Sequence, residues 1–268
     1  MALTNSGRTP GLAGTFRDLE DDIVFSHPEA RPRLPGPSGT GSRGPLFSGE
    51  GSGSAQPSEY SSSRADAVAK LTKPSSSTVQ QLSAAITTVL KLHKGYETSS
   101  KPKDEALRLA KEKVIKDIVK AYGVGLTHVT GLEFSNRNDS SNHAETLGTF
   151  IIVFDSVLVH PGFTASVILH ESSHAQRNAE LDNAGVRLSF ATEDIWSALK
   201  EFEGAQLEID SAAKTGITEK EKKEATSLRN SHLSEIEALM GKKTRTEIEN
   251  GGLDAVRARF IQQLKSRP

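Results

Sequence analysis

The sequence predicts an α+β protein that is mostly helical, with a small β-sheet before a central helix and a disordered N-terminal tail. Three observations predict this class. From residue 64 onward, apolar residues recur at helical intervals over most of the chain. Residues 123–159 instead contain short alternating or continuous apolar runs, which are typical of strands. Residues 1–62 are rich in Gly, Ser and Pro and poor in apolar side chains.

Composition excludes several classes of partner. The formal net charge is -1 at pH 7, so the chain has no long-range attraction for nucleic acid or anionic lipid. It contains no Cys, which rules out disulfides and thiolate zinc sites. No apolar run approaches the roughly 18 residues of a membrane-spanning helix, and the N-terminus lacks the basic and apolar regions of a Sec-type signal. We therefore expect no nucleic-acid partner and no membrane span.

Residues 1–62 are predicted to form a disordered tail, and residues 63–268 one domain. The stretch at residues 31–45 and the Gly/Ser segment after it have too few apolar side chains to offset the entropy of ordering them. Two interpretations remain open for this tail. It is either a linker without a recognition role, or a delivery segment that binds a secretion apparatus or a chaperone.

The first ordered elements are two amphipathic helices and a small sheet. Apolar residues recur at helical spacing between Val79 and Leu90, and a second periodic segment runs from near Pro102 to Gly123. Residues 127–134 then alternate weakly, and residues 150–154 form a continuous apolar run that predicts a buried strand. The polar run at 136–143 between them is expected to be a loop.

The central helix carries the sequence His170-Glu171-Ser172-Ser173-His174. Residues four apart lie one turn apart on the same helix face, so His170 and His174 have the spacing of two ligands on one metal. Neutral imidazole is a preferred ligand of Zn²⁺, and Glu171 is placed to accept a proton from a zinc-bound water. The motif predicts a zinc site with Glu171 as the catalytic base. The competing interpretation is two histidines on an ordinary helix surface.

A helix from about Thr192 to Gly216 is expected to supply the third ligand. It contains both Glu201 and Glu203. We prefer Glu203, because the small residues after it allow two helices to approach closely. Glu208 and Asp210 are candidates to orient a histidine. Two further helices follow, one opened by a capping box at Thr218 and one over residues 253–264.

The motif followed by Glu203-Gly204-Ala205 resembles the gluzincin metallopeptidases, in which one helix bears two His and the catalytic Glu and a later helix bears a Glu ligand. The resemblance covers about residues 124–215. It implies a zincin-like fold, zinc ligands at His170, His174 and Glu203, and Glu171 as base and proton shuttle in peptide-bond hydrolysis. The order of strand, turn and helices is also similar to metallopeptidase toxin domains of bacterial polymorphic toxins and injected effectors.

The chain departs from the gluzincin pattern in several places. The spacer between His174 and Glu203 is longer than in thermolysin-like enzymes, no Asn precedes Glu203, and Leu207 stands where those enzymes have an Asp. No downstream residue stands out as the transition-state stabiliser. The side chains available for that role or to assist at the site are His143, His160, His232, Tyr122 and Arg177.

The sequence therefore predicts a zinc metallopeptidase acting on a protein or peptide substrate. By resemblance it is a bacterial effector or toxin, secreted or injected without a Sec-type signal. A cytoplasmic location is the alternative. The alternative function is that of a helical interaction protein whose metal site is structural or vestigial.

Overall fold

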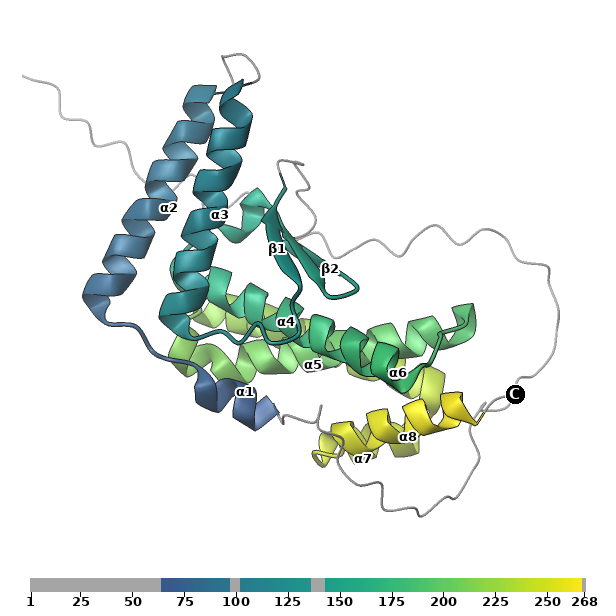
Figure 1. Ribbon diagram of the computed structural model, residues 1–268. Coiled ribbons are helices and arrows are strands. Elements are labelled where there is room, and N and C mark those ends of the chain that lie inside the picture. Colours follow the sequence, from purple (N-terminus) through teal and green to yellow (C-terminus); the bar gives the residue numbers. More distant parts are fainter. Residues whose placement is uncertain (1–63, 97–101, 136–142, 267–268) are drawn as a thin grey trace, which may run out of the picture. The chain divides into compact units, whose positions relative to one another are not determined.

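The computed structural model describes residues 64–96, 102–135 and 143–266, all of which belong to one compact unit. The predicted class is confirmed, since the described chain is mostly helical with one small sheet (Figure 1). The predicted tail, residues 1–62, lies outside the described residues. None of the helices in the described ranges is both long and apolar enough to cross a membrane.

The elements follow the chain in one order. They are α1 (Arg64–Lys70), α2 (Ser76–Tyr96), α3 (Pro102–Tyr122), β1 (Gly131–Phe134), β2 (Ala144–Leu147), β3 (Phe150–Val153), the 3-10 turn η1 (Asp155–Val157), α4 (Pro161–Ala184), α5 (Phe190–Thr215), α6 (Glu219–Met240), α7 (Lys242–Glu249) and α8 (Leu253–Lys265). The short helix α7 was not predicted, because its eight residues are mostly polar and carry little apolar periodicity.

The sheet has the strand order β1-β3-β2, with β1 parallel and β2 antiparallel to β3. One face is buried, because Leu132, Phe134, Ile151 and Val153 all point into the core that α3 and α4 cover. The predicted first strand is shorter than expected. β2 was not predicted at all, and it forms one edge of the sheet and packs along α4.

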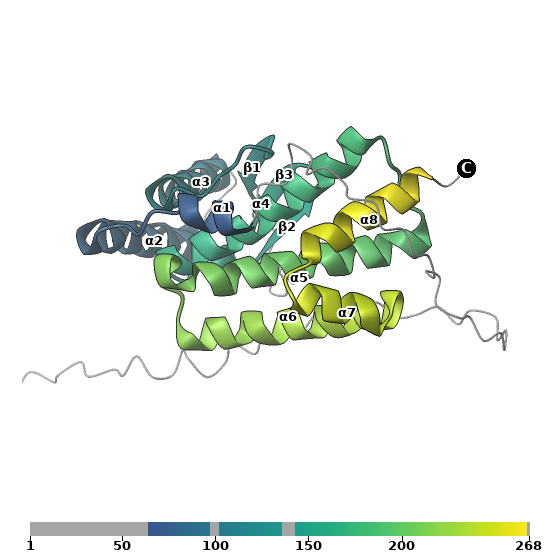
Figure 2. The ribbon, with the colours of Figure 1, turned by 90° about the horizontal axis from the view of Figure 1, so that it is seen from below.

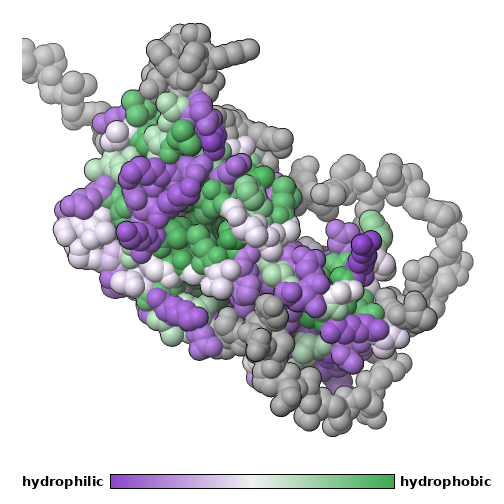
Figure 3. All heavy atoms as spheres, viewed as in Figure 1, coloured by the Kyte–Doolittle hydropathy of each residue, from purple (hydrophilic) through white to green (hydrophobic). Residues whose placement is uncertain are grey.

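The outer side of β1 carries an apolar hollow beside the charged side chains of α3 (Figure 3). Its volume is about 450 Å³. The lining residues are Glu112, Lys116, Leu126, Val129, Gly131, Leu132, Glu133 and Phe150. None of the site residues predicted from the sequence is among them.

Helix α4 begins at a histidine cap. His160 is the N-cap, and its Nδ1 accepts the backbone N–H of Phe163 at 3.2 Å. The other ring nitrogen, Nε2, lies 3.0 Å from a carboxylate oxygen of Glu221 at the start of α6. Thr164 is already inside the helix, and its hydroxyl donates to the carbonyl of Val157. His160 therefore connects the N-termini of α4 and α6.

Helices α4 and α5 run antiparallel and pack directly on each other, and α6 packs on α5 (Figure 2). Two glycines permit the close approach of α4 and α5. A Cβ on Gly162 of α4 would lie 2.1 Å from the carbonyl oxygen of Thr215, and one on Gly204 of α5 would lie 2.4 Å from the His170 ring. The histidine face of α4 is therefore held against α5.

Candidate metal centre

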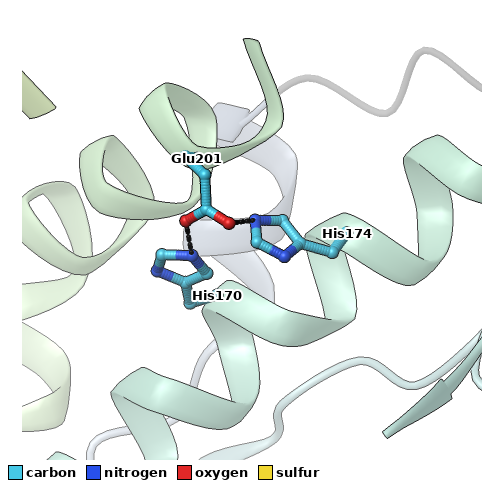
Figure 4. A group of neighbouring side chains, drawn as sticks. All are labelled: His170, His174 and Glu201. Atoms are coloured by element: carbon cyan, nitrogen blue, oxygen red, sulfur yellow. Dashed lines mark hydrogen bonds and ion pairs between the residues drawn. The ribbon is translucent and has the colours of Figure 1, made fainter. Parts of the chain in front are cut away.

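His170 and His174 lie on one face of α4 and face Glu201 of α5 (Figure 4). One ligand atom from each of the three side chains can be chosen so that all lie within 4.8 Å of one another. His170 Nε2 is 3.3 Å from Glu201 Oε2, and His174 Nε2 is 3.9 Å from Glu201 Oε1. Both histidines are buried, whereas the Glu201 side chain remains 32% exposed. The centre is therefore reachable from solvent beside Glu201.

The structure corrects the preference for Glu203 as third ligand. Glu203 lies two residues after Glu201, about 200° around α5, and so faces elsewhere. Its carboxylate is 1% exposed and accepts two hydrogen bonds from Arg177, at 2.8 and 2.7 Å, and one from Arg257, at 2.9 Å. With both oxygens bound by guanidinium groups, Glu203 has no carboxylate oxygen left for a metal at the histidines.

The Glu203 carboxylate instead joins three helices. Arg177 comes from α4 and Arg257 from α8, and both are almost fully buried. Burial would raise the pKa of Glu203, but the charges of Arg257 and Arg177 outweigh that effect and hold it below its usual value. This network fixes α5 between α4 and α8, which makes Glu203 a structural residue.

Three residues on one face of α5, Glu201, Gly204 and Glu208, surround the His170 ring. Glu201 lies at Nε2, and Glu208 lies 2.6 Å from Nδ1. Gly204 stands between the two glutamates and leaves room for the ring itself. Positions 201, 204 and 208 follow the i, i+3, i+7 pattern of one helix face. Glu208 is thus the partner that fixes the orientation of His170, as the sequence suggested, whereas exposed Asp210 accepts a hydrogen bond from Gln206.

Replacing Gly204 by Ala should weaken metal binding about ten-fold or more while leaving the protein folded. The added Cβ displaces the His170 ring, and misplacing a ligand by its surroundings typically costs metal affinity on that scale. Ala also favours the helix by about 1 kcal/mol, which opposes a loss of stability. Zinc titration and thermal unfolding separate the two effects. Gly125→Ala is the control, because its Cβ meets nothing within 4 Å.

Glu171 points toward the sheet and lies beside His174. Its Oε2 accepts a hydrogen bond from the Thr146 hydroxyl of β2 at 2.6 Å and lies 3.4 Å from His174 Nδ1. Burial raises the pKa of Glu171, but His174, His170 and the Thr146 hydrogen bond together bring it below its usual value. The carboxylate is therefore ionised and oriented, as a proton acceptor must be.

The electrostatics of the centre favour bound positive charge. Burial alone would lower the pKa of His170, but the carboxylates of Glu201 and Glu208 at its two nitrogens raise it well above the usual value. Burial likewise raises the pKa of Glu201, and the two histidines more than reverse this, so its pKa lies below the usual range. The carboxylates of Glu201 and Glu208 therefore stabilise positive charge at the position of His170.

The donor set fits a divalent transition metal. Two imidazoles and one carboxylate are the ligands of many catalytic zinc sites, which leave a fourth position open. One atom of the structure supports this independently: His174 Nε2 is buried and has no hydrogen-bond partner among the described residues. The nearest oxygen of Glu201 is too far away for a hydrogen bond. A buried imidazole nitrogen aimed at a carboxylate without touching it is what a site for an intervening ion would have.

The other residues considered from the sequence lie away from the histidine pair or serve packing. Tyr122 is in the core, and the guanidinium of Arg177 donates hydrogen bonds to the Glu203 carboxylate. His143 packs its ring edge-on against Phe163 at a centroid distance of 4.9 Å, and burial lowers its pKa.

His232 of α6 is the exception among them. Its Nδ1 lies 3.0 Å from a carboxylate oxygen of Glu235, and its proximity contributes to the lowered pKa of Glu201. The position of His232 could not be inferred from spacing, because it depends on how α6 packs on α5.

The chain matches no protein-family model, no curated protein and no solved structure. The gluzincin resemblance therefore stays a prediction from the sequence motif.

Proposed function

We propose that the protein is a zinc-dependent metallopeptidase. The observation that supports this most is the convergence of Glu201 on the histidines of a His-Glu-x-x-His helix, with Glu171 held beside them by Thr146. His170, His174 and Glu201 would hold the ion, and Glu208 would orient His170 from the far side. The assignment keeps the predicted histidines and base and replaces Glu203 by Glu201.

The reaction follows from the positions of these groups. Zinc bound here would polarise a substrate carbonyl and lower the pKa of a water molecule to about 7. Glu171 accepts the proton from the attacking water and delivers it to the leaving amine, so that the same carboxylate serves both half-reactions. Its hydrogen bond to Thr146 fixes one oxygen and leaves the other for proton transfer.

The edge strand β2 offers a place for an extended substrate. Within the part of the chain that the structure describes, β2 pairs with β3 alone, and Thr146 brings it next to Glu171. A peptide can pair with such an edge through main-chain hydrogen bonds, which bind without regard to side chains. We therefore propose a protein or peptide substrate that lies along β2 and crosses the metal centre.

Metal analysis and a cleavage screen test the proposal together. Purified protein should contain about one zinc per chain, and His170→Ala or His174→Ala should abolish it. The zinc-loaded protein should cut peptides in a proteome digest, and chelation should stop the cutting. Wild-type protein without zinc affinity would overturn the proposal. A zinc-loaded protein that cleaves nothing would point instead to a helical interaction protein with a structural metal.

Residues 1–62 are proposed to serve delivery and not chemistry, on the basis of their composition alone. Deleting them should leave the melting temperature, the zinc content and the peptidase activity unchanged, while export from the producing cell falls. Thermal unfolding, metal analysis and an export assay provide these readouts. Unfolding of the shortened chain, or its export at the full rate, would contradict this role without affecting the metal centre.

A further inference from the structure

One polar bridge lies just beyond the metal centre on the same helix faces. Asn178 follows His174 by four residues on α4, and Lys200 precedes Glu201 on α5. The Lys200 ammonium donates to Asn178 Oδ1 at 3.1 Å, and Asn178 Nδ2 donates to the carbonyl of Gly148 at 2.6 Å. Gly148 is in the turn between β2 and β3. The ammonium therefore lies where the edge strand ends, about one helical turn past His174.

Lys200 differs from four other buried or partly buried cations around the core. Arg177 and Arg257 bind carboxylates, Lys111 pairs with Asp155, and Lys214 donates to three backbone carbonyls. Lys200 is half-buried, and the one hydrogen bond recorded for it within the described ranges goes to a neutral amide.

The carboxylates near Lys200 are already engaged. Burial lowers the pKa of Lys200, and Glu201 and Glu171 oppose this by attracting the ammonium electrostatically. These two carboxylates, however, already bind the histidines and Thr146. Among the described residues, the charge of Lys200 is thus held at the centre without a hydrogen-bonded anion, although an ammonium has three donors.

We propose that Lys200 determines specificity by binding a carboxylate of the substrate close to the scissile bond. This inference rests on the proposed peptidase function. One helical turn is about 5.4 Å, and an extended peptide advances about 3.3 Å per residue, so the carboxylate belongs one or two residues from the cleaved bond. Either an Asp or Glu side chain or the C-terminal carboxylate supplies the same chemistry. The substrates are therefore acidic at that position.

The charge of Lys200 is expected to change the rate for such substrates strongly. A hydrogen bond between an ammonium and a carboxylate in a half-buried place is worth about a ten- to hundred-fold preference over a neutral side chain. Lys200→Met keeps much of the length of the side chain and removes the charge, whereas Lys200→Glu reverses it. Lys243→Met is the control, since Lys243 is exposed on α7.

The test uses the zinc-loaded full chain and a proteome-derived peptide mixture, with new termini identified by mass spectrometry. Wild-type protein and Lys243→Met should cut preferentially where Asp or Glu lies within two residues of the cut, or within two residues of a free C-terminus. Lys200→Met should lose this preference, and Lys200→Glu should favour Lys or Arg there. Peptides amidated at the C-terminus distinguish the two sources of carboxylate, because only the side-chain preference survives amidation.

The outcomes separate this inference from the proposed function. Cleavage by wild-type protein without any acidic preference would overturn the role of Lys200 and leave the peptidase intact. An acidic preference that persists in folded, zinc-loaded Lys200→Met would do the same. A wild-type protein that binds zinc and cleaves nothing would overturn both. If Lys200→Met does not fold, Lys200→Arg must retain the preference, and its loss there would count against the inference.

Discussion

Replacing Glu171 by Gln should lower peptidase activity by about two to four orders of magnitude without loss of zinc. The amide is nearly the same size as the carboxylate and still pairs with the Thr146 hydroxyl, but it cannot accept a proton from water. Because Glu171 is not among the three proposed ligands, metal content should stay at the wild-type value. The measurements are kcat/KM on a peptide found in the cleavage screen and zinc content by elemental analysis.

Glu219→Gln is the matched control for this experiment, since Glu219 is an exposed glutamate in the first turn of α6. It should retain both zinc and activity. Undiminished activity in Glu171→Gln would exclude Glu171 as the base and would leave the hydrolytic proposal without a proton acceptor.

The largest effect on stability is expected for Glu203, and the largest effect on zinc for Glu201. Glu203→Ala leaves the guanidinium groups of Arg177 and Arg257 buried without their shared carboxylate. Breaking a buried ion pair on one side typically costs about 3–5 kcal/mol, so much of the free energy of unfolding should be lost. Glu201→Ala removes a partly exposed ligand and should leave a folded protein with two protein ligands and weak zinc binding.

The two variants are therefore compared with each other. Denaturant unfolding gives the stability of each one, and zinc titration of the same preparations gives its zinc affinity. Glu201→Ala should lower the zinc affinity far more than the free energy of unfolding. Glu203→Ala should lower the free energy of unfolding far more than the zinc affinity of the protein that remains folded. A stable Glu203→Ala protein that has lost zinc, together with full zinc retention in Glu201→Ala, would restore Glu203 as the ligand.

The sequence was sufficient for the features that depend on helical periodicity. The spacing of His170 and His174 placed them on one face of a buried helix, and the periodic apolar residues predicted α3 and α5 closely. The small residue Gly204 correctly indicated a close approach of two helices. Full use of the helical spacing would also have selected Glu201, because it lies three residues before Gly204 on the same face, whereas Glu203 does not.

Other features depend on tertiary contacts that no local pattern carries. β2 has only four residues, half of them exposed, and it exists because β3 and α4 hold it. The His160 cap requires one ring nitrogen to meet Phe163 while the other meets Glu221, 61 residues further along the chain. Arg257 reaches Glu203 across 54 residues, so the burial of that ion pair could not be anticipated.

The contact between Glu203 and Arg257 also joins segments that the ribosome makes at different times. The ribosome makes α4 and α5 well before α8, and until α8 emerges the carboxylates of Glu203 and Glu180 share a single guanidinium, that of Arg177. Burying a carboxylate without its full set of partners is costly, so we expect the packing of α4 on α5 to be less stable before α8 docks. The α4–α5 pair that carries the histidines and Glu201 therefore depends for part of its stability on α8, which the ribosome makes last among the described helices.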